Sequence, residues 1–294
     1  MNTVLITGAN GQLGMALRAG SECFEGFKLY FTDIDTLDIL DKPAVESYIR
    51  SSGIDTVVNC AAYTAVDKAE DDAERCMCIN CDAVRNIGEV AASLGVRVIH
   101  VSTDYVFDGK GARPYREEDA TNPVSVYGKS KLAGEQALTA ACPDAVIIRT
   151  AWLYSETGAN FMKTMLRLGM ERDRVGVVAD QQGTPTYAGD LADAILKVLA
   201  SGAFVPGIYH YTDEGVCTWY DFAVRIFEIA GLKCSVDPLA TAGYPTRAVR
   251  PAYSVLDKTK IRDTYGVITP PWEESLHKCL QHHLMIKQQE NVFI

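Results

Sequence analysis

A tyrosine stands four residues before a lysine near the middle of the chain, and a serine-threonine pair precedes both. The residues are Tyr127 and Lys131, preceded by Ser102 and Thr103. On a helix, a spacing of four residues places two side chains on one face, about one turn apart. A phenol has an ordinary pKa near ~10, and a neighbouring ammonium lowers that pKa by stabilising the phenolate. The spacing therefore predicts that Tyr127 acts as a proton donor or acceptor, with a pKa that Lys131 lowers.

The hydroxyl groups upstream would supply a second hydrogen bond to the same reacting oxygen. Neighbouring residues of a strand point to opposite faces, so only one of Thr103 and Ser102 can easily reach that oxygen. A tyrosine and a lysine at this spacing also occur by chance on solvent-exposed helices, where such pairs contribute little. A second motif, at the N-terminus of the chain, supports the functional interpretation of this pair.

A short β-branched run at residues 3–7 leads directly into a glycine-rich segment and then into a helical stretch. Glycines let the backbone turn tightly and approach phosphate groups, and the N–H groups of the following helix bind a pyrophosphate. The spacing is G-x-x-G-x-x-G instead of the common G-x-G-x-x-G. The segment predicts a dinucleotide site formed by Gly8, Asn10, Gly11, Gln12, Leu13 and Gly14.

An acidic residue about 20 positions after such glycines commonly binds a ribose hydroxyl. Asp33 fits this role, with Asp35 and Asp38 as competitors. Asp33 would bind the 2′-hydroxyl of NADH and repel the 2′-phosphate of NADPH, and no basic residue follows until Lys42. The sequence therefore favours NADH or use of both cofactors. Further candidate cofactor contacts are Ile39, Ala61, Ala62, Tyr63 and Val101.

The elements that would position these residues alternate between strands and helices. Expected strands lie at 3–7, 28–33, 56–59, 96–102 and 145–150, and expected helices at 42–52, 70–94 and 126–141. This alternation predicts an α/β fold with a Rossmann-like, doubly wound parallel sheet and a ligand at the C-terminal ends of its strands. We expect a dinucleotide-binding domain over 1–150 and, over 151–294, mainly a smaller substrate lobe with segments returning to the main sheet.

The bulk composition narrows the class of protein. The chain has 294 residues, a net charge of −10 and no basic run, which argues against nucleic acid and anionic membranes as partners. No stretch approaches the ~20 apolar residues that span a bilayer, and no basic segment precedes the first apolar run. We therefore expect a cytoplasmic protein. Nine scattered cysteines, Cys23 among them, fit reduced thiols. The cluster Cys76, Cys78 and Cys81 lacks a second ligand pair, so we expect no metal site.

Longer motifs add a resemblance to a known family. The segments resemble those of the dTDP-4-dehydrorhamnose reductases, which are extended short-chain dehydrogenases/reductases. They are GQLG at 11–14, NCAAYTAVD at 59–67, STDYVFDG at 102–109, YGKSKLAGE at 127–135, RTAWLY at 149–154, DQQGTPT at 180–186 and RPAYSVLD at 250–257.

This resemblance implies reduction of the 4-keto group of a dTDP-linked 6-deoxyhexose, dTDP-4-dehydrorhamnose, to dTDP-L-rhamnose, a cell-surface polysaccharide precursor, by NADH or NADPH. By the resemblance, Thr103 orients the carbonyl oxygen and Lys131 also bonds the nicotinamide ribose. The substrate contacts it implies are Thr103, Asp104 and Trp152. Arg247 and Arg250 suit pyrophosphate recognition, because a guanidinium pairs with phosphate oxygens. Core packing is the alternative interpretation for Trp152. For both arginines, the alternative is a solvated position on the surface.

Two positions distinguish this chain from related proteins. Nucleotide-sugar 4,6-dehydratases resemble this fold but carry an Asp-Glu pair after the threonine, whereas Tyr105 follows Asp104 here. This argues for plain ketone reduction. The resemblance allows a homodimer, and some family members are described as magnesium-bridged dimers that use a glutamate in the first helix. Met15, Ala16 and Leu17 begin that helix here, which argues against a metal-bridged dimer.

Two other functions remain open from sequence. One is a non-catalytic, dinucleotide-binding regulatory subunit, which the joint presence of Thr103, Tyr127 and Lys131 disfavours. The other is reduction of a different nucleotide-linked 4-keto sugar.

Overall fold

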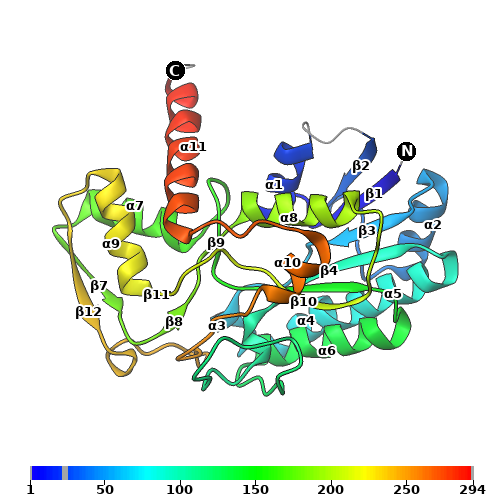
Figure 1. Ribbon diagram of the computed structural model, residues 1–294, viewed down its shortest axis with the longest axis horizontal. Helices are drawn as coiled ribbons and strands as arrows, with labels where there is room; N and C mark the ends of the chain where they lie inside the picture. The colour runs from blue at the N-terminus through cyan, green and yellow to red at the C-terminus, as the bar shows by residue number, and fades with distance from the viewer. Residues whose placement is uncertain (1, 22–25, 293–294) are drawn as a thin grey trace.

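A single sheet of six parallel strands forms the centre of the molecule (Figure 1). The structure is a computed structural model and describes residues 2–21 and 26–292. The strand order is β10-β5-β4-β3-β1-β2. The bounds are β1 Asn2–Thr7, β2 Phe27–Thr32, β3 Thr56–Asn59, β4 Arg97–Thr103, β5 Val146–Thr150 and β10 Gly207–His210. This confirms the expected Rossmann-like sheet.

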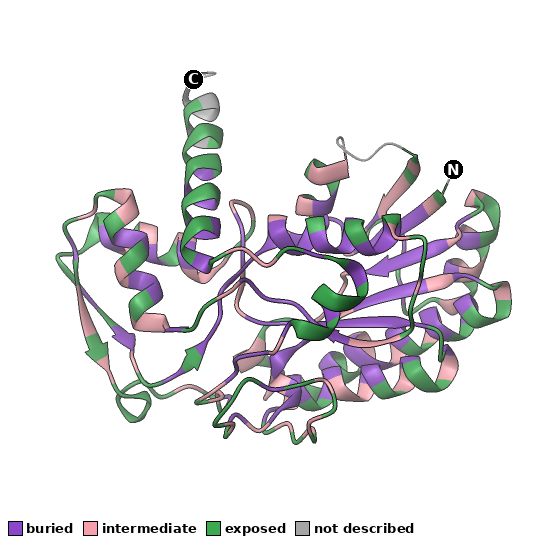
Figure 2. Cartoon of the chain, viewed as in Figure 1, coloured by how far each residue is buried: buried purple, intermediate pink, exposed green. Residues whose placement is uncertain are grey.

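Helices cover both faces of the sheet, because successive side chains of each strand enter opposite cores. In β1, Val4 and Ile6 pack with α1 and α8, whereas Leu5 packs with α2 and α5 on the other face. Buried strands flanked by partly exposed helices are visible in Figure 2. One face carries α1 Gln12–Gly20, α8 Ala188–Ala200 and α10 Thr259–Tyr265, and the other α2 Lys42–Ser52, α5 Ala83–Leu94 and α6 Val126–Ala141.

A smaller lobe has its own core, built around Phe222, Ile226 and Leu276. Its strands β7 and β12 pair in parallel, and α11 projects away from the body (Figure 1). The elements are β6 Leu153–Tyr154, α7 Phe161–Glu171, β7 Arg174–Val178, β8 Gln182–Gly183, β9 Thr186–Tyr187, β11 Cys217–Thr218, α9 Trp219–Ala230, β12 Ser235–Leu239, η4 Thr241–Gly243 and α11 Trp272–Val292. Since β10 and α10 lie with the main sheet, a division near residue 150 stays a proposal.

The expected helical stretch over 70–94 is continuous from residue 73 to residue 94, but it is not a regular α-helix throughout. The segment contains α4 Ala73–Met77, a π-helical turn η2 Cys78–Asp82 and α5, preceded by α3 Val66–Ala69. The buried Asn80 in this turn bonds the backbone of Tyr63 and the hydroxyl of Ser130. The backbone carbonyl oxygen of Asn80 would lie 2.0 Å from a Cβ at position 134, so this close approach requires a glycine there, Gly134 of α6. The π turn therefore allows this segment to pack closely against α6.

A buried ion pair fixes α6 to the sheet. Arg149 of β5 donates from Nη2 to Oε2 of Glu135 at 2.7 Å and from Nε to Oε1 at 2.9 Å. Ser102 of β4 donates to the same carboxylate at 2.5 Å. All three side chains are buried, so the carboxylate depends on these donors to replace water.

Short elements and loops complete the chain. The 3₁₀ turn η3 Asp104–Val106 follows β4 directly and begins the segment that leads to α6. Among the described helices, none combines the length and the apolar character that a bilayer crossing requires.

The ion pair predicts a specific stability effect. Arg149→Met should lower the free energy of unfolding by about 3–5 kcal/mol, because Glu135 would remain buried without a cationic partner. Chemical denaturation followed by circular dichroism measures this loss. Arg174→Met, which breaks the exposed Arg174–Asp237 pair, is the matched control and should change little. Combining Arg149→Met with Glu135→Leu should recover part of the stability; equal losses in all three variants would contradict the assignment.

Candidate active site

A cleft of about 1320 Å³ runs along the C-terminal ends of the strands, where a doubly wound sheet binds its ligand. It extends from the glycine-rich turn after β1 to the smaller lobe at Trp152. Nearly all the sequence-predicted site residues line it: Gly8, Asn10, Gly11, Gln12, Leu13, Gly14, Asp33, Asp38, Ile39, Ala61, Ala62, Val101, Thr103, Asp104, Tyr127, Lys131 and Trp152.

The glycine-rich turn presents the start of α1 to the cleft. Gly8 has φ +65°, and a Cβ there would lie 2.6 Å from the backbone nitrogen of Ala61. A Cβ at Gly14 would lie 2.5 Å from the carbonyl oxygen of Gly8. The helix has no side-chain cap and no acidic residue in its first turn, so its N–H groups are suited to an anion. These features fit the pyrophosphate of a dinucleotide.

Asp33 lies at the end of β2 beside this turn. One carboxylate oxygen accepts the N–H of Asn10 at 2.8 Å and the other that of Ile34 at 2.8 Å. Asp33 thus holds the glycine-rich turn as well as facing the cleft. Asp38 also lines this end, and its carboxylate accepts the N–H of Leu40 at 2.9 Å.

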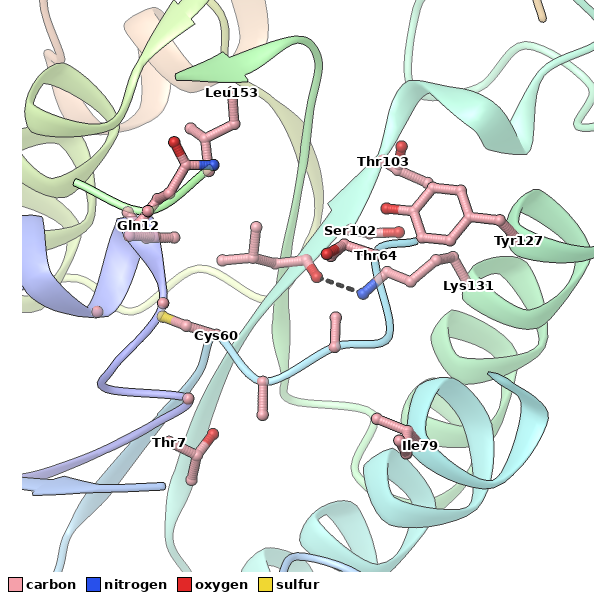
Figure 3. Close-up of a pocket in the computed structure, with 18 of the residues that line it drawn as sticks. Thr7, Gln12, Cys60, Thr64, Ile79, Ser102, Thr103, Tyr127, Lys131 and Leu153 are labelled. Atoms are coloured by element: carbon pink, nitrogen blue, oxygen red, sulfur yellow. Dashed lines mark hydrogen bonds between the residues drawn. The ribbon is translucent and has the colours of Figure 1, made fainter. Parts of the chain in front are cut away.

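Tyr127 and Thr103 meet at the other end of the cleft. Ser125 caps α6 by accepting the N–H of Gly128 at 3.1 Å, which places Tyr127 in the first turn. Thr103 ends β4, and Figure 3 shows its side chain beside the phenol. The phenol packs edge-on against Tyr105. The two hydroxyl groups are therefore placed to bond one oxygen atom.

The structure differentiates the two candidate hydroxyls. Ser102 donates to Glu135, so its hydroxyl belongs to the buried ion pair. Thr103 donates instead to Asp104 at 3.0 Å and bonds the phenol of Tyr127. Of the two hydroxyls, that of Thr103 is therefore the one that lies beside the phenol of Tyr127.

The protonation of Tyr127 differs from the expectation. Burial raises the pKa of the phenol above its ordinary value, the Thr103 hydrogen bond lowers the pKa, and Asp104 and Tyr105 raise it further. Lys131 is not among these causes. Its Nζ donates to the carbonyl oxygen of Val101 at 2.7 Å (Figure 3), and burial lowers its own pKa to about 8. The phenol is therefore neutral at pH 7, as a proton donor must be.

Asp104 occupies the buried corner behind Thr103. Burial raises the pKa of its carboxyl to about 6, while hydrogen bonds from Ser254 and Thr103 lower it. The second carboxylate oxygen of Asp104 has no hydrogen-bond partner. This buried oxygen is therefore left with unused hydrogen-bonding capacity.

Trp152 forms part of the cleft wall in a strained backbone conformation. Its φ is 49°, which a bulky residue rarely adopts, and such strain is concentrated at functional sites. The indole stacks on Trp219 with ring centroids 3.6 Å apart. Core packing and a cleft-facing position therefore coexist in one side chain.

Three sequence-predicted residues do not line the cleft. Tyr63 is directed to Asp72, with 3.3 Å between its hydroxyl and the carboxylate. Arg247 pairs with Asp71, and Arg250 pairs with Asp67 at 2.6 Å. Arg250 also bonds Tyr105, which does line the cleft, and its Nη1 is buried without a partner. Both arginines therefore tie the loop before residue 252 to the segment around α3.

Sequence reasoning predicted Gln12 as a cofactor contact but missed the residues through which it joins the two lobes. Gln12 accepts hydrogen bonds from Ser155 at 3.0 Å and from Asn160 at 2.8 Å. The only local signal was Asn160, which caps α7 and so marks a helix start. Arg75 also lines the cleft, where it adds a positive charge.

Among the side chains that the structure describes, no three His, Cys, Asp or Glu residues are arranged to hold a metal ion. The described cysteines are free thiols, and Cys23 lies outside the described residues.

Comparison with known proteins agrees with this geometry. The family model described as RmlD substrate binding domain matches residues 1–285. A Sinorhizobium fredii dTDP-4-dehydrorhamnose reductase is 43% identical over 94% of this chain and 95% of its own. The solved Clostridium acetobutylicum dTDP-4-dehydrorhamnose reductase is 43% identical, with a TM-score of 0.91 over 95% of this chain and 98% of its own. The Bacillus anthracis enzyme of that name, solved in complex with NADP, is 38% identical, with a TM-score of 0.92 over 96% and 100%. This chain therefore belongs to the dTDP-4-dehydrorhamnose reductase family.

Proposed function

We propose that this protein catalyses the NAD(P)H-dependent reduction of the 4-keto group of dTDP-4-dehydrorhamnose, yielding dTDP-L-rhamnose. The observation that carries the proposal is the meeting of Tyr127 and Thr103 in one cleft with a glycine-rich helix start. A neutral phenol and a hydroxyl at one end, with an anion-binding backbone at the other, suit a ketone and a dinucleotide.

The nicotinamide dinucleotide supplies the hydride when it is bound. The chain contributes the glycine-rich turn from Gly8 to Gly14 for the pyrophosphate and Asp33 for the adenosine ribose. Tyr127 donates its proton to the developing alkoxide at the 4-position, and Thr103 orients that oxygen. Because a hydroxyl rotates freely, Thr103 can turn from Asp104 toward the carbonyl oxygen.

The surroundings favour reduction over elimination. Dehydration of a sugar needs an acid-base pair beside the ring, and Tyr105 stands where the related dehydratases carry a glutamate. Burial raises the pKa of the Tyr105 phenol, so Tyr105 is a poor base. The alternative of a non-catalytic binding subunit leaves the Tyr127–Thr103 pair without a purpose.

We also propose a cytoplasmic location and, for any homodimer, assembly without a metal at α1. The free thiols of the described cysteines support the location. Gln12, Leu13 and Met15 open α1 with no carboxylate in its first turn. A chelator should therefore leave the molar mass measured by light scattering unchanged; dissociation by a chelator would contradict the second part.

The activity is tested with a panel of dTDP- and UDP-linked 4-keto sugars, by following cofactor oxidation and identifying the product by NMR. We expect turnover with the dTDP-4-dehydrorhamnose substrate. Tyr127→Phe removes the proton donor and keeps the ring, so kcat should fall by about 10²–10⁴-fold with a small change in KM. Tyr220→Phe, an exchange outside the cleft, is the matched control. Near wild-type turnover in Tyr127→Phe would contradict the proposed mechanism. Activity confined to a UDP-linked sugar would contradict the proposed substrate.

Cofactor choice is tested by Asp33→Asn. The amide oxygen still accepts the N–H of Asn10, but the negative charge that repels a 2′-phosphate is lost. The ratio of NADPH to NADH affinity should rise by at least about tenfold, or about 1.4 kcal/mol, in calorimetric titrations. Asp35→Asn is the control, because this neighbour does not line the cleft. An unchanged ratio would remove Asp33 from ribose recognition.

A further inference from the structure

A chain of buried polar side chains leads away from Lys131 through the sheet. Its Nζ lies 3.4 Å from Nε2 of His100 on β4. Nδ1 of His100 lies 3.0 Å from Nδ2 of Asn59 on β3, and Oδ1 of Asn59 accepts the hydroxyl of Thr7 on β1 at 2.7 Å. All four side chains are buried. The cleft chemistry described above gives His100 no role.

The direction of these hydrogen bonds is fixed at Asn59. The backbone N–H of Ala61 lies 3.1 Å from Oδ1 of Asn59, and a backbone N–H can only donate. The amide must therefore direct its oxygen toward Ala61 and Thr7. Its NH₂ group then faces Nδ1 of His100, which has to accept.

The tautomer of His100 follows from that contact. An imidazole that accepts at Nδ1 carries its proton on Nε2 when it is neutral. Burial is the main cause that holds the pKa of His100 well below its ordinary value, and it keeps the ring neutral whether or not Lys131 is charged. The Nε2–H group therefore points toward Nζ of Lys131.

Two donors would face each other if Lys131 were an ammonium, because an ammonium has no lone pair. A neutral amine can accept the Nε2–H of His100 while it still donates to Val101. We propose that His100 is a positioning residue that presents its Nε2 proton to Lys131 and so favours the amine form of this lysine. The proposal rests on the proposed function for its significance, since Lys131 is the lysine of the catalytic pair.

The charges around Lys131 are consistent with this assignment. The titratable groups that influence it are Glu135 on α6, Cys60 after β3 and Cys76 on α4. Glu135 is already paired with Arg149. Burial raises the pKa of Cys60 to about 12 and also raises that of Cys76, so both thiols stay uncharged. None of these groups offers the ammonium a free anion.

On this proposal, burial and the His100 donor act on Lys131 in the same direction. Burial lowers the pKa of Lys131 to about 8, against an ordinary value near ~10.4. Removing the His100 donor should raise the pKa, because the ammonium would lose an unfavourable neighbour. The alkaline limb of a kcat/KM profile that reports Lys131 should move with it.

The first test uses the unmodified protein and needs no turnover, so it is independent of the proposed activity. The ¹⁵N shifts of the His100 ring show which nitrogen carries the proton, and the ¹³Cε shift of Lys131, assigned with Lys131→Met, follows its titration. We expect the proton on Nε2 and a midpoint about two pH units below the ordinary value. A proton on Nδ1, or an ordinary lysine midpoint, would overturn the proposal.

Three variants then test the hydrogen bonds that link Lys131, His100, Asn59 and Thr7. Asn59→Asp offers His100 an acceptor at Nδ1, so the ring proton should move to Nδ1 and the Lys131 midpoint should rise by about one pH unit or more. His100→Leu removes the donor altogether and should raise the midpoint without adding a charge. Thr7→Val is the matched control, because Ala61 still fixes Asn59, and its midpoint should equal that of the wild type. An unmoved midpoint in folded Asn59→Asp and His100→Leu would refute the role of His100.

Discussion

The ion pair between Glu135 and Arg149 is the contact on which the catalytic geometry depends. Tyr127 and Lys131 belong to α6, whereas Thr103 and the Val101 carbonyl belong to β4, so the helix must sit at one height on the sheet. Arg149 and Ser102 hold the Glu135 carboxylate from two adjacent strands and thereby set that height. A buried carboxylate that loses one of its donors destabilises the fold strongly, so the structure tolerates little displacement of α6 along the sheet.

Burial acts in opposite directions on the two members of the catalytic pair. Removing water disfavours a phenolate and disfavours an ammonium, so the pKa of Tyr127 rises and that of Lys131 falls. Burial thus keeps the phenol protonated at neutral pH, which is the state that the proposed proton donation requires. A simple picture in which the lysine charge activates the tyrosine omits this desolvation.

Local sequence patterns specified the sheet and the glycine-rich turn well. Apolar β-branched runs indicate buried strands. The glycines at 8, 11 and 14 indicate a turn in which backbone segments approach each other closely. Strand ends then located Thr103 and Val101. These features depend on residues close in sequence, where periodicity carries the information.

Features set by distant contacts were not predictable in the same way. The π turn at Cys78–Asp82 reflects the close approach of Gly134, and a composition that favours helix gives no sign of it. Arg250 pairs with Asp67 in preference to lining the cleft, a contact between segments far apart in the chain. The orientation of Lys131 depends on burial, which no single sequence displays.

The bridge from Gln12 to Ser155 and Asn160 has a mechanical consequence. Gln12 opens α1 at the glycine-rich turn, while the other two residues lie in the smaller lobe. A movement of the smaller lobe relative to the sheet would therefore also displace the start of α1. The two ends of the cleft are therefore coupled through one side chain, so a ligand held at the glycine-rich turn would also restrain the smaller lobe.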